Sequence, residues 1–177
     1  MAVRHASVTE AASTNVRLDG LDAGFSYYGN VGAIEFMTQD ADHKIHVTAR
    51  TSNGNYSKTF QGLNHNDDNT ASPARPMMIQ NLVSNDTFRT AYGGFNPTGE
   101  SVTVEFEVID SSGNTIGTAF TRSISGHQYI GFSPFTEAGV PYPDYSFNNT
   151  WLKITPLSGS GELMSYGATA NNITSDP

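Results

Sequence analysis

The sequence predicts an all-β fold, and two observations carry that prediction. About seven strand-like segments rich in Val, Ile, Phe, Tyr and Thr follow one another over residues 77–177, with Gly, Asn, Ser or Pro between them. No stretch longer than a turn or two shows the period of an amphipathic helix. Short strands at this density are typical of an immunoglobulin-like antiparallel β-sandwich. We therefore expect a sandwich of about seven strands, with a smaller N-terminal β unit packed on it.

Residues 1–61 are expected to form that smaller β unit. Two strands are predicted at 31–38 and 45–51, joined by a polar turn. The same order of strand, turn and strand recurs at 150–155 and 162–169, so we interpret the two segments as equivalent hairpins. Because a lone hairpin cannot bury a core, the N-terminal unit must lean on the sandwich, on the residues before it or on another molecule.

Residues 62–76 separate the two parts. This segment contains one large apolar residue, Leu63, among fifteen positions. Its composition predicts a polar linker, and a loop of this length usually serves a function or connects domains. A C-terminal β-sandwich domain is therefore expected at 77–177.

The strands of that domain are predicted from the alternation of apolar and polar residues. They are expected at Met77–Val83, Phe88–Phe95, Val102–Ile109, Ile116–Ile124, Gln128–Phe132, Trp151–Thr155 and Leu163–Thr169. In the third of these, Val102, Val104, Phe106 and Val108 should face the core, and the polar residues between them should face solvent. A tight turn is predicted at 110–114. The proline-rich segment 133–149 is expected to be a long, stiff loop.

Composition and charge exclude several classes of function. Nine Lys plus Arg against seventeen Asp plus Glu give a net charge of −8, and no basic cluster is present, so nucleic acid is not an expected partner. The chain has no cysteine, which excludes thiol catalysis and cysteine-ligated metal sites. It has no apolar run long enough to span a membrane, and no signal peptide is visible in it. We expect an extracellular or cell-surface location, with a signal or an upstream domain removed before Met1.

Several turn and strand residues follow a recognisable pattern. They are Arg89 and Thr90, then Asn96, then the turn Asp110 to Gly113, then Gly117, and the ending Tyr166–Pro177. Over roughly residues 31–177 the chain resembles a β-sandwich module of large secreted bacterial proteins. The resemblance implies an exported, non-catalytic module, and it implies no particular ligand.

The strongest candidate for a binding site is a group of aromatic residues near the proline-rich loop. Exposed aromatic side chains beside a polar loop can stack on sugar rings or anchor a protein partner. The alternative is a loop packed over the open end of the sandwich, with the tryptophan in the core. The candidate contact residues are Tyr142, Tyr145, Phe147 and Trp151, with Phe132 and Phe135 nearby.

Charged residues give weaker candidates. Asp67 and Asp68 lie in the polar linker, where oxygen ligands could hold calcium, but a solvated polar loop is the better explanation of these residues. Glu105 and Glu107 share one face of a strand, and paired acids can cleave glycosidic bonds. Their alternation with Val and Phe explains them fully as a solvent face, so we expect no catalytic residue and no enzyme activity.

The N-terminal residues 3–18 offer a second way to contact a partner. Isolated apolar positions there suit an edge strand, which could pair within the chain or add to the sheet edge of a neighbour. The sequence therefore predicts a non-enzymatic extracellular module, structural or adhesive, that acts through its loops and sheet edges. A carbohydrate-binding module using the aromatics near 142–151, and a filament or virion subunit assembled by strand exchange, remain as alternatives.

Overall fold

In the computed structural model the chain consists of two compact units, Met1–Ala33 and Ile34–Pro177. The structure describes residues 36, 47–53, 56–64, 70–72 and 75–174. The predicted strand at 31–38, apart from Phe36, and the N-terminal residues 3–18 lie outside the described residues. The predictions that rest on them, including strand exchange through the N-terminus, stay predictions.

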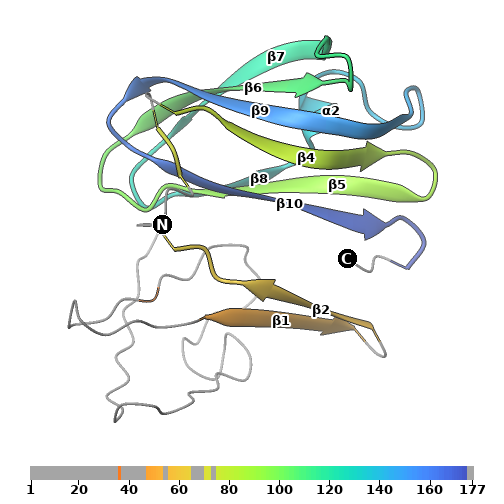
Figure 1. The fold of residues 1–177 in the computed structure, drawn as a ribbon, viewed down its shortest axis with the longest axis horizontal. Helices are drawn as coiled ribbons and strands as arrows, with labels where there is room; N and C mark the ends of the chain where they lie inside the picture. Colours follow the sequence, from red (N-terminus) through yellow and green to blue (C-terminus); the bar gives the residue numbers. More distant parts are fainter. Residues whose placement is uncertain (1–35, 37–46, 54–55, 65–69, 73–74, 175–177) are drawn as a thin grey trace. The chain divides into compact units, whose positions relative to one another are not determined.

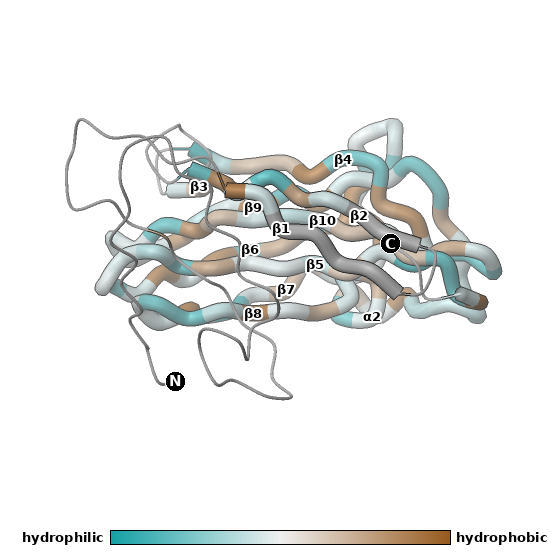
Figure 2. The backbone as a smooth tube through the Cα atoms, turned by 90° about the horizontal axis from the view of Figure 1, so that it is seen from below, coloured by the Kyte–Doolittle hydropathy of each residue, from teal (hydrophilic) through white to brown (hydrophobic). Residues whose placement is uncertain are grey.

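The described part of the second unit is an antiparallel β protein, as predicted. Eight strands form one sheet in the order β3-β10-β5-β4-β9-β6-β7, and β8 pairs with β5 (Figure 1). The strands are β3 (Thr70–Ala71), β4 (Met77–Ser84), β5 (Phe88–Phe95), β6 (Val102–Ile109), β7 (Thr115–Ile124), β8 (Tyr129–Phe132), β9 (Phe147–Gly159) and β10 (Leu163–Asn171). Hydrophilic residues gather in the connections at the two ends of the strands (Figure 2).

A separate two-stranded sheet precedes this one. It consists of β1 (Thr48–Asn53) and β2 (Tyr56–Gln61), which pair antiparallel from Thr48 with Gln61 to Asn53 with Tyr56. The sequence predicted a strand at 45–51 as the second arm of a hairpin. In the structure the corresponding strand begins at Thr48 and forms the first arm of a hairpin with the segment that follows it.

One further prediction about the sheet is wrong. The C-terminal segments 150–155 and 162–169 do not form a hairpin, because β9 lies between β4 and β6 whereas β10 pairs with β5 and β3. Both edges of β9 are already occupied, so the turn after it must carry the chain to another part of the sheet. Strand β3 lies within the predicted linker 62–76, and both of its residues are buried against β10.

The core contains ring contacts between strands that are not neighbours in the sheet. Figure 1 shows β7, β6, β9 and β4 above β8, β5 and β10. The ring of Phe106 on β6 lies 5.3 Å from that of Tyr92 on β5 and 5.2 Å from that of Phe132 on β8, measured between centroids. Because β4 and β9 separate β5 from β6 within the sheet, these contacts are made across its enclosed face. Such edge-to-face packing of buried rings adds to the stabilisation that burial alone provides.

The alternation predicted for β6 is confirmed. Its core-facing side chains are fully buried and its polar ones are half-buried. The buried residues are Val102, Val104, Phe106 and Val108. The predicted turn after β6 is also confirmed, because the Asp110 carboxylate accepts hydrogen bonds from the backbone amides of Ser112 and Asn114, both at 2.8 Å.

The proline-rich segment 133–149 is only partly the loop that the sequence predicts. It begins with the one-turn helix α2 (Pro134–Glu137), and its last residues belong to β9. Phe135 of α2 is buried in the core and is 1 % exposed. The segment is tied to β7 by a hydrogen bond of 2.9 Å from the Thr118 amide to the Ala138 carbonyl. Helix α2 therefore covers the core beside the edge strand β7.

Gly117 is required for this close approach. Its φ is +69°, and a methyl group on it would overlap the carbonyl oxygen of Ala138. We expect Gly117→Ala to lower the free energy of unfolding by about 3 kcal/mol, because the left-handed backbone and the overlap both oppose a side chain. Urea unfolding followed by circular dichroism measures the loss.

Gly113 supplies the matched control for this prediction. Its φ is +87°, but a methyl group there would meet open space. Gly113→Ala should therefore cost only the backbone term, about 1 kcal/mol. Equal losses in the two variants would mean that α2 does not press against β7.

Candidate functional site

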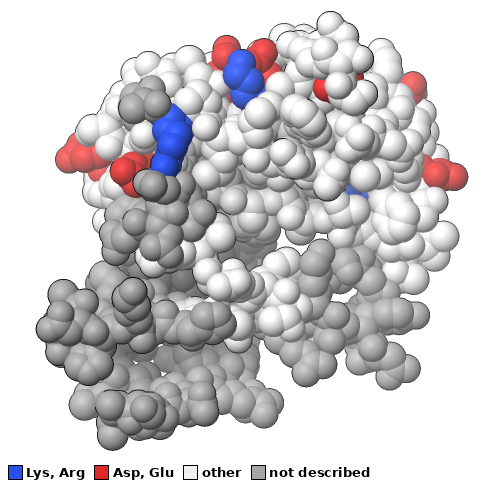
Figure 3. Space-filling view, viewed as in Figure 1, with Lys and Arg blue, Asp and Glu red and all other residues white. Residues whose placement is uncertain are grey.

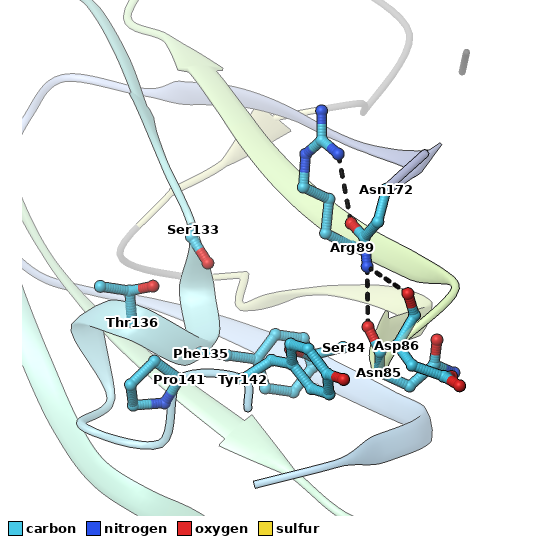
Figure 4. Close-up of a pocket in the computed structure, with 10 residues that line it drawn as sticks. All are labelled: Ser84, Asn85, Asp86, Arg89, Ser133, Phe135, Thr136, Pro141, Tyr142 and Asn172. Carbon is cyan, nitrogen blue, oxygen red and sulfur yellow. Dashed lines mark hydrogen bonds between the residues drawn. The ribbon is translucent and has the colours of Figure 1, made fainter. Parts of the chain in front are cut away.

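A hollow of about 470 Å³ opens at the end of the sheet where β4 turns into β5. One wall is polar and comes from Ser84, Asn85, Asp86, Arg89 and, after β10, Asn172. The Asn172 side-chain amide donates to the carbonyls of Asn85 at 2.8 Å and Asp86 at 3.2 Å. Arg89 Nη1 donates to the side-chain oxygen of Asn172 at 3.2 Å (Figure 4). These bonds join two chain segments into one preformed wall.

The local sequence explains the shape of this wall. The side-chain oxygen of Asn85 accepts hydrogen bonds from the amides of Thr87 at 2.9 Å and Phe88 at 2.7 Å, which closes the turn between β4 and β5. Asparagine is favoured in such turns because its side chain can replace a backbone acceptor. The side-chain amide of Asn85 also donates to Asn148 at 2.7 Å, so the turn is fixed to the beginning of β9.

The opposite wall comes from α2 and the loop after it. It consists of Ser133, Phe135, Thr136, Pro141 and Tyr142. Figure 4 shows the rings of Phe135 and Tyr142 at the base of the hollow, with the hydroxyls of Ser133 and Thr136 on the α2 side. The Tyr142 side chain is 45 % exposed, so much of its ring is available to a ligand.

The predicted aromatic residues form a stack next to this wall. The Phe135 and Phe147 rings are nearly parallel at 10° and 5.5 Å, and the Phe147 and Tyr145 rings are at 7° and 6.3 Å. The stack runs from buried Phe135 through half-buried Phe147 to Tyr145, which is 48 % exposed. The core therefore fixes the orientation of an exposed ring.

Trp151 does not belong to this group. Thr150 and Leu152 on either side of it are buried, so Trp151 faces away from the core and is half-buried on the other side of the sheet. The pairing of β9 with β4 shifts register near Leu82, and Asn149 has a positive φ of 54°. This irregularity puts Phe147 on the core side, although strict alternation would place it on the same face as Trp151. The alternative prediction that the tryptophan enters the core is also wrong.

The polar wall was not predicted as a ligand site from the sequence. Arg89 and Asn172 belong to the pattern shared with a bacterial module, and Asn85 and Asn172 each begin an acceptor tripeptide for N-glycosylation. Arg89 and Asn172 are far apart in the sequence but meet because β5 pairs with β10 over eight residue pairs. The pattern shared with the bacterial module was the signal present in the sequence, and it includes two of the five residues of the polar wall, Arg89 and Asn172.

The chemistry of the hollow suits binding. Its ten lining residues include one carboxylate, Asp86, and one guanidinium, Arg89. Ser133, Thr136 and Tyr142 add hydroxyl groups, which can both donate and accept hydrogen bonds.

The other charged candidates are placed as follows. Asp67 and Asp68 lie outside the described residues, and within the described ranges no three His, Cys, Asp or Glu side chains gather in a way that could hold a metal. Glu107 on β6 accepts a hydrogen bond of 2.6 Å from Lys153 of β9, and this bond lowers the pKa of the Glu107 carboxyl. Glu107 thus makes a surface ion pair, as expected for a polar outer face.

The surface of the described part carries few charges. Figure 3 shows its Lys, Arg, Asp and Glu side chains as scattered single residues or small groups on the face in view. Among the described residues no helix is long and apolar enough to cross a lipid bilayer.

The residues behind the bacterial resemblance have structural roles here. Asn96 is buried and bonds four groups around it, Asp110 closes a turn, and Thr90 pairs with Thr169 through their hydroxyls at 3.2 Å. These roles are those of an antiparallel sheet domain. No protein-family model matches the chain, and no curated protein matches it.

Proposed function

We propose that this chain is a non-enzymatic, extracellular binding module whose working part is the hollow between the β4–β5 turn and α2. The observation that carries the proposal is the preformed polar wall of Asn85, Arg89 and Asn172 opposite the exposed ring of Tyr142. Loops held on a rigid sheet are the usual place for binding residues. A site that is fixed before the ligand arrives loses less entropy on binding.

The proposed architecture is an immunoglobulin-like β-sandwich. The contacts of Phe106 with Tyr92 and Phe132 support it, because they join strands that are not neighbours in the sheet. In this architecture connecting loops gather at the two ends of the strands, and one end is commonly used for recognition. The proposed cell-surface location and adhesive role rest on the resemblance to secreted bacterial modules and on the low Lys and high Asn, Thr and Gly content of the sequence.

A binding panel tests this function. Beads coated with the chain would be offered neutral polysaccharides, acidic polysaccharides and extracellular proteins immobilised on a surface. We expect retention on at least one of these classes. Thr136→Trp, which places a large side chain at an exposed position in the wall of the hollow, should abolish the retention.

Ser160→Trp is the matched control. Ser160 is exposed in the turn after β9, at the end of the sheet opposite the hollow, so this variant should bind as the natural chain does. Retention that survives Thr136→Trp would contradict the proposed site. The chain would also be assayed with chromogenic ester, glycoside and peptide substrates. A turnover activity that disappears in Asp86→Asn would contradict the non-enzymatic role.

A further inference from the structure

We infer that the hollow binds a neutral saccharide, with a sugar ring against Tyr142 and its hydroxyls on Ser133, Asp86 and Arg89. This inference rests on the proposed function and names its ligand class. The volume of about 470 Å³ lies within the range of small-molecule sites, roughly 300–1,000 Å³, which leaves room for a short saccharide.

Two exposed tyrosines lie at or beside the hollow. Tyr142 and Tyr145 belong to one turn, closed by a hydrogen bond of 3.2 Å from the Tyr145 amide to the Pro141 carbonyl. Their side chains are 45 % and 48 % exposed. The face of an aromatic ring carries negative charge density, which attracts the weakly positive C–H groups on the flat side of a sugar. Stacking against Phe147 keeps the Tyr145 ring in place without a ligand.

Several polar groups in the lining can make further hydrogen bonds to a ligand. Ser133 precedes α2 but makes no side-chain capping bond to it, and its exposed hydroxyl faces the hollow. Asp86 is exposed, and within the described residues its carboxylate accepts one side-chain hydrogen bond, from Thr87 at 3.2 Å. Together with Arg89, the site presents both donors and acceptors. Sugar hydroxyls can donate and accept at the same time, so they match such a mixed surface.

The charge of the site also favours a neutral ligand. Asp86 and Arg89 contribute one negative and one positive group, so the lining as a whole is neutral. The chain around it carries a net charge of −8, which repels anionic polymers at long range. A neutral ligand avoids this repulsion and does not require an excess of basic residues.

Isothermal titration calorimetry and amide NMR on the full chain test the inference. The probes are neutral oligosaccharides built from glucose, galactose, mannose or N-acetylglucosamine, with oligogalacturonate as the acidic comparison. We expect saturable binding of at least one neutral probe, with shift changes centred on residues 84–89, 133–145 and 171–173. Tryptophan fluorescence should not change, because Trp151 is not among the residues lining the hollow and faces away from the core.

Two tyrosine variants make the test specific. Tyr142→Ala should weaken binding by roughly tenfold, and Tyr142→Phe should bind nearly as well as the natural chain, because the ring is what stacks. Tyr166→Ala removes a similarly exposed ring, 44 % exposed, from β10 and should leave the affinity unchanged.

The outcomes separate this inference from the proposed function. In one outcome, oligogalacturonate or a protein binds, this binding is lost in Thr136→Trp, and no neutral probe binds. That outcome would support the proposed binding module and overturn the inference of a neutral saccharide. Neutral binding that is unaffected by Tyr142→Ala, or with shifts away from the hollow, would overturn the saccharide site. Failure to bind any class in the panel or any probe would overturn both.

Discussion

Replacing Phe106 with alanine should lower the free energy of unfolding by about 3–5 kcal/mol, a large part of the stability of a domain of this size. Phe106 is fully buried, and its ring contacts those of Tyr92, Phe120 and Phe132 within 5.5 Å between centroids. The alanine variant loses these contacts and leaves a cavity that the paired strands around it cannot close. Urea unfolding at constant pH measures the change, with an unaltered slope as evidence that the native state is still compact.

Two comparisons separate the cavity from a general sensitivity to substitution. Phe106→Leu keeps most of the volume and should cost about 1 kcal/mol. Phe88→Ala removes the same ring from a position that is 41 % exposed, and it should change stability by no more than about 0.5 kcal/mol. A loss below about 1 kcal/mol for Phe106→Ala would show that β5 and β8 do not pack against β6 in solution.

The strands with clear alternation could be predicted from the sequence. Strand β6 matches its predicted bounds, Val102–Ile109, and β5 matches Phe88–Phe95. In both, turn residues follow immediately, so the ends are defined by local chemistry. Strand β9 extends beyond its predicted bounds at both ends. Pairing with β4 and β6 on its two edges keeps residues of low intrinsic β-propensity in the strand.

Elements that depend on distant partners could not be predicted. Strand β3 has two residues and exists because Leu163 and Met164 of β10 lie opposite them. The pairing partners of β9 and β10 also depend on the whole sheet, which is why the predicted C-terminal hairpin is wrong. Helix α2 is too short to show a period, although Pro134 at its start is a known helix signal.

Only part of the candidate site could be predicted from the sequence, because the rest depends on residues that are distant in the chain. Tyr142, Tyr145 and Phe147 are close in the sequence, and their aromatic character in a proline-rich loop led to the prediction of contact residues there. Of the three, Tyr142 lines the hollow. The bond between Arg89 and Asn172 follows from the register of β5 with β10, which local patterns do not encode. Phe147 and Trp151 were predicted as one group, but the register shifts between β9 and β4 put them on opposite faces of the strand.

The buried amide of Asn96 leads to the second large effect. Its side-chain nitrogen donates to the carbonyls of Glu100 at 2.7 Å and Ile124 at 3.4 Å, and its oxygen accepts from the amide and hydroxyl of Thr98 at 3.0 and 2.8 Å. Asn96→Ala should lower the free energy of unfolding by about 2–4 kcal/mol, because it leaves buried polar groups without partners. Asn114→Ala, at an exposed turn position, is the control and should cost no more than about 0.5 kcal/mol.

Asn96→Asp distinguishes the hydrogen bonds from the volume of the side chain. The carboxylate would still accept from Thr98, but its second oxygen would face two carbonyls, so burial and repulsion should raise the pKa of the new carboxyl above that of an unfolded aspartate. A raised folded pKa stabilises the protein below the unfolded pKa, about 3.9, and this stabilisation is lost as the pH rises through the folded value. Relative to the natural chain, the aspartate variant should therefore be nearly as stable at low pH and much less stable at neutral pH. The alanine variant should show a constant deficit over the same range, and an aspartate deficit that does not depend on pH would mean that the amide does not donate to Glu100 and Ile124.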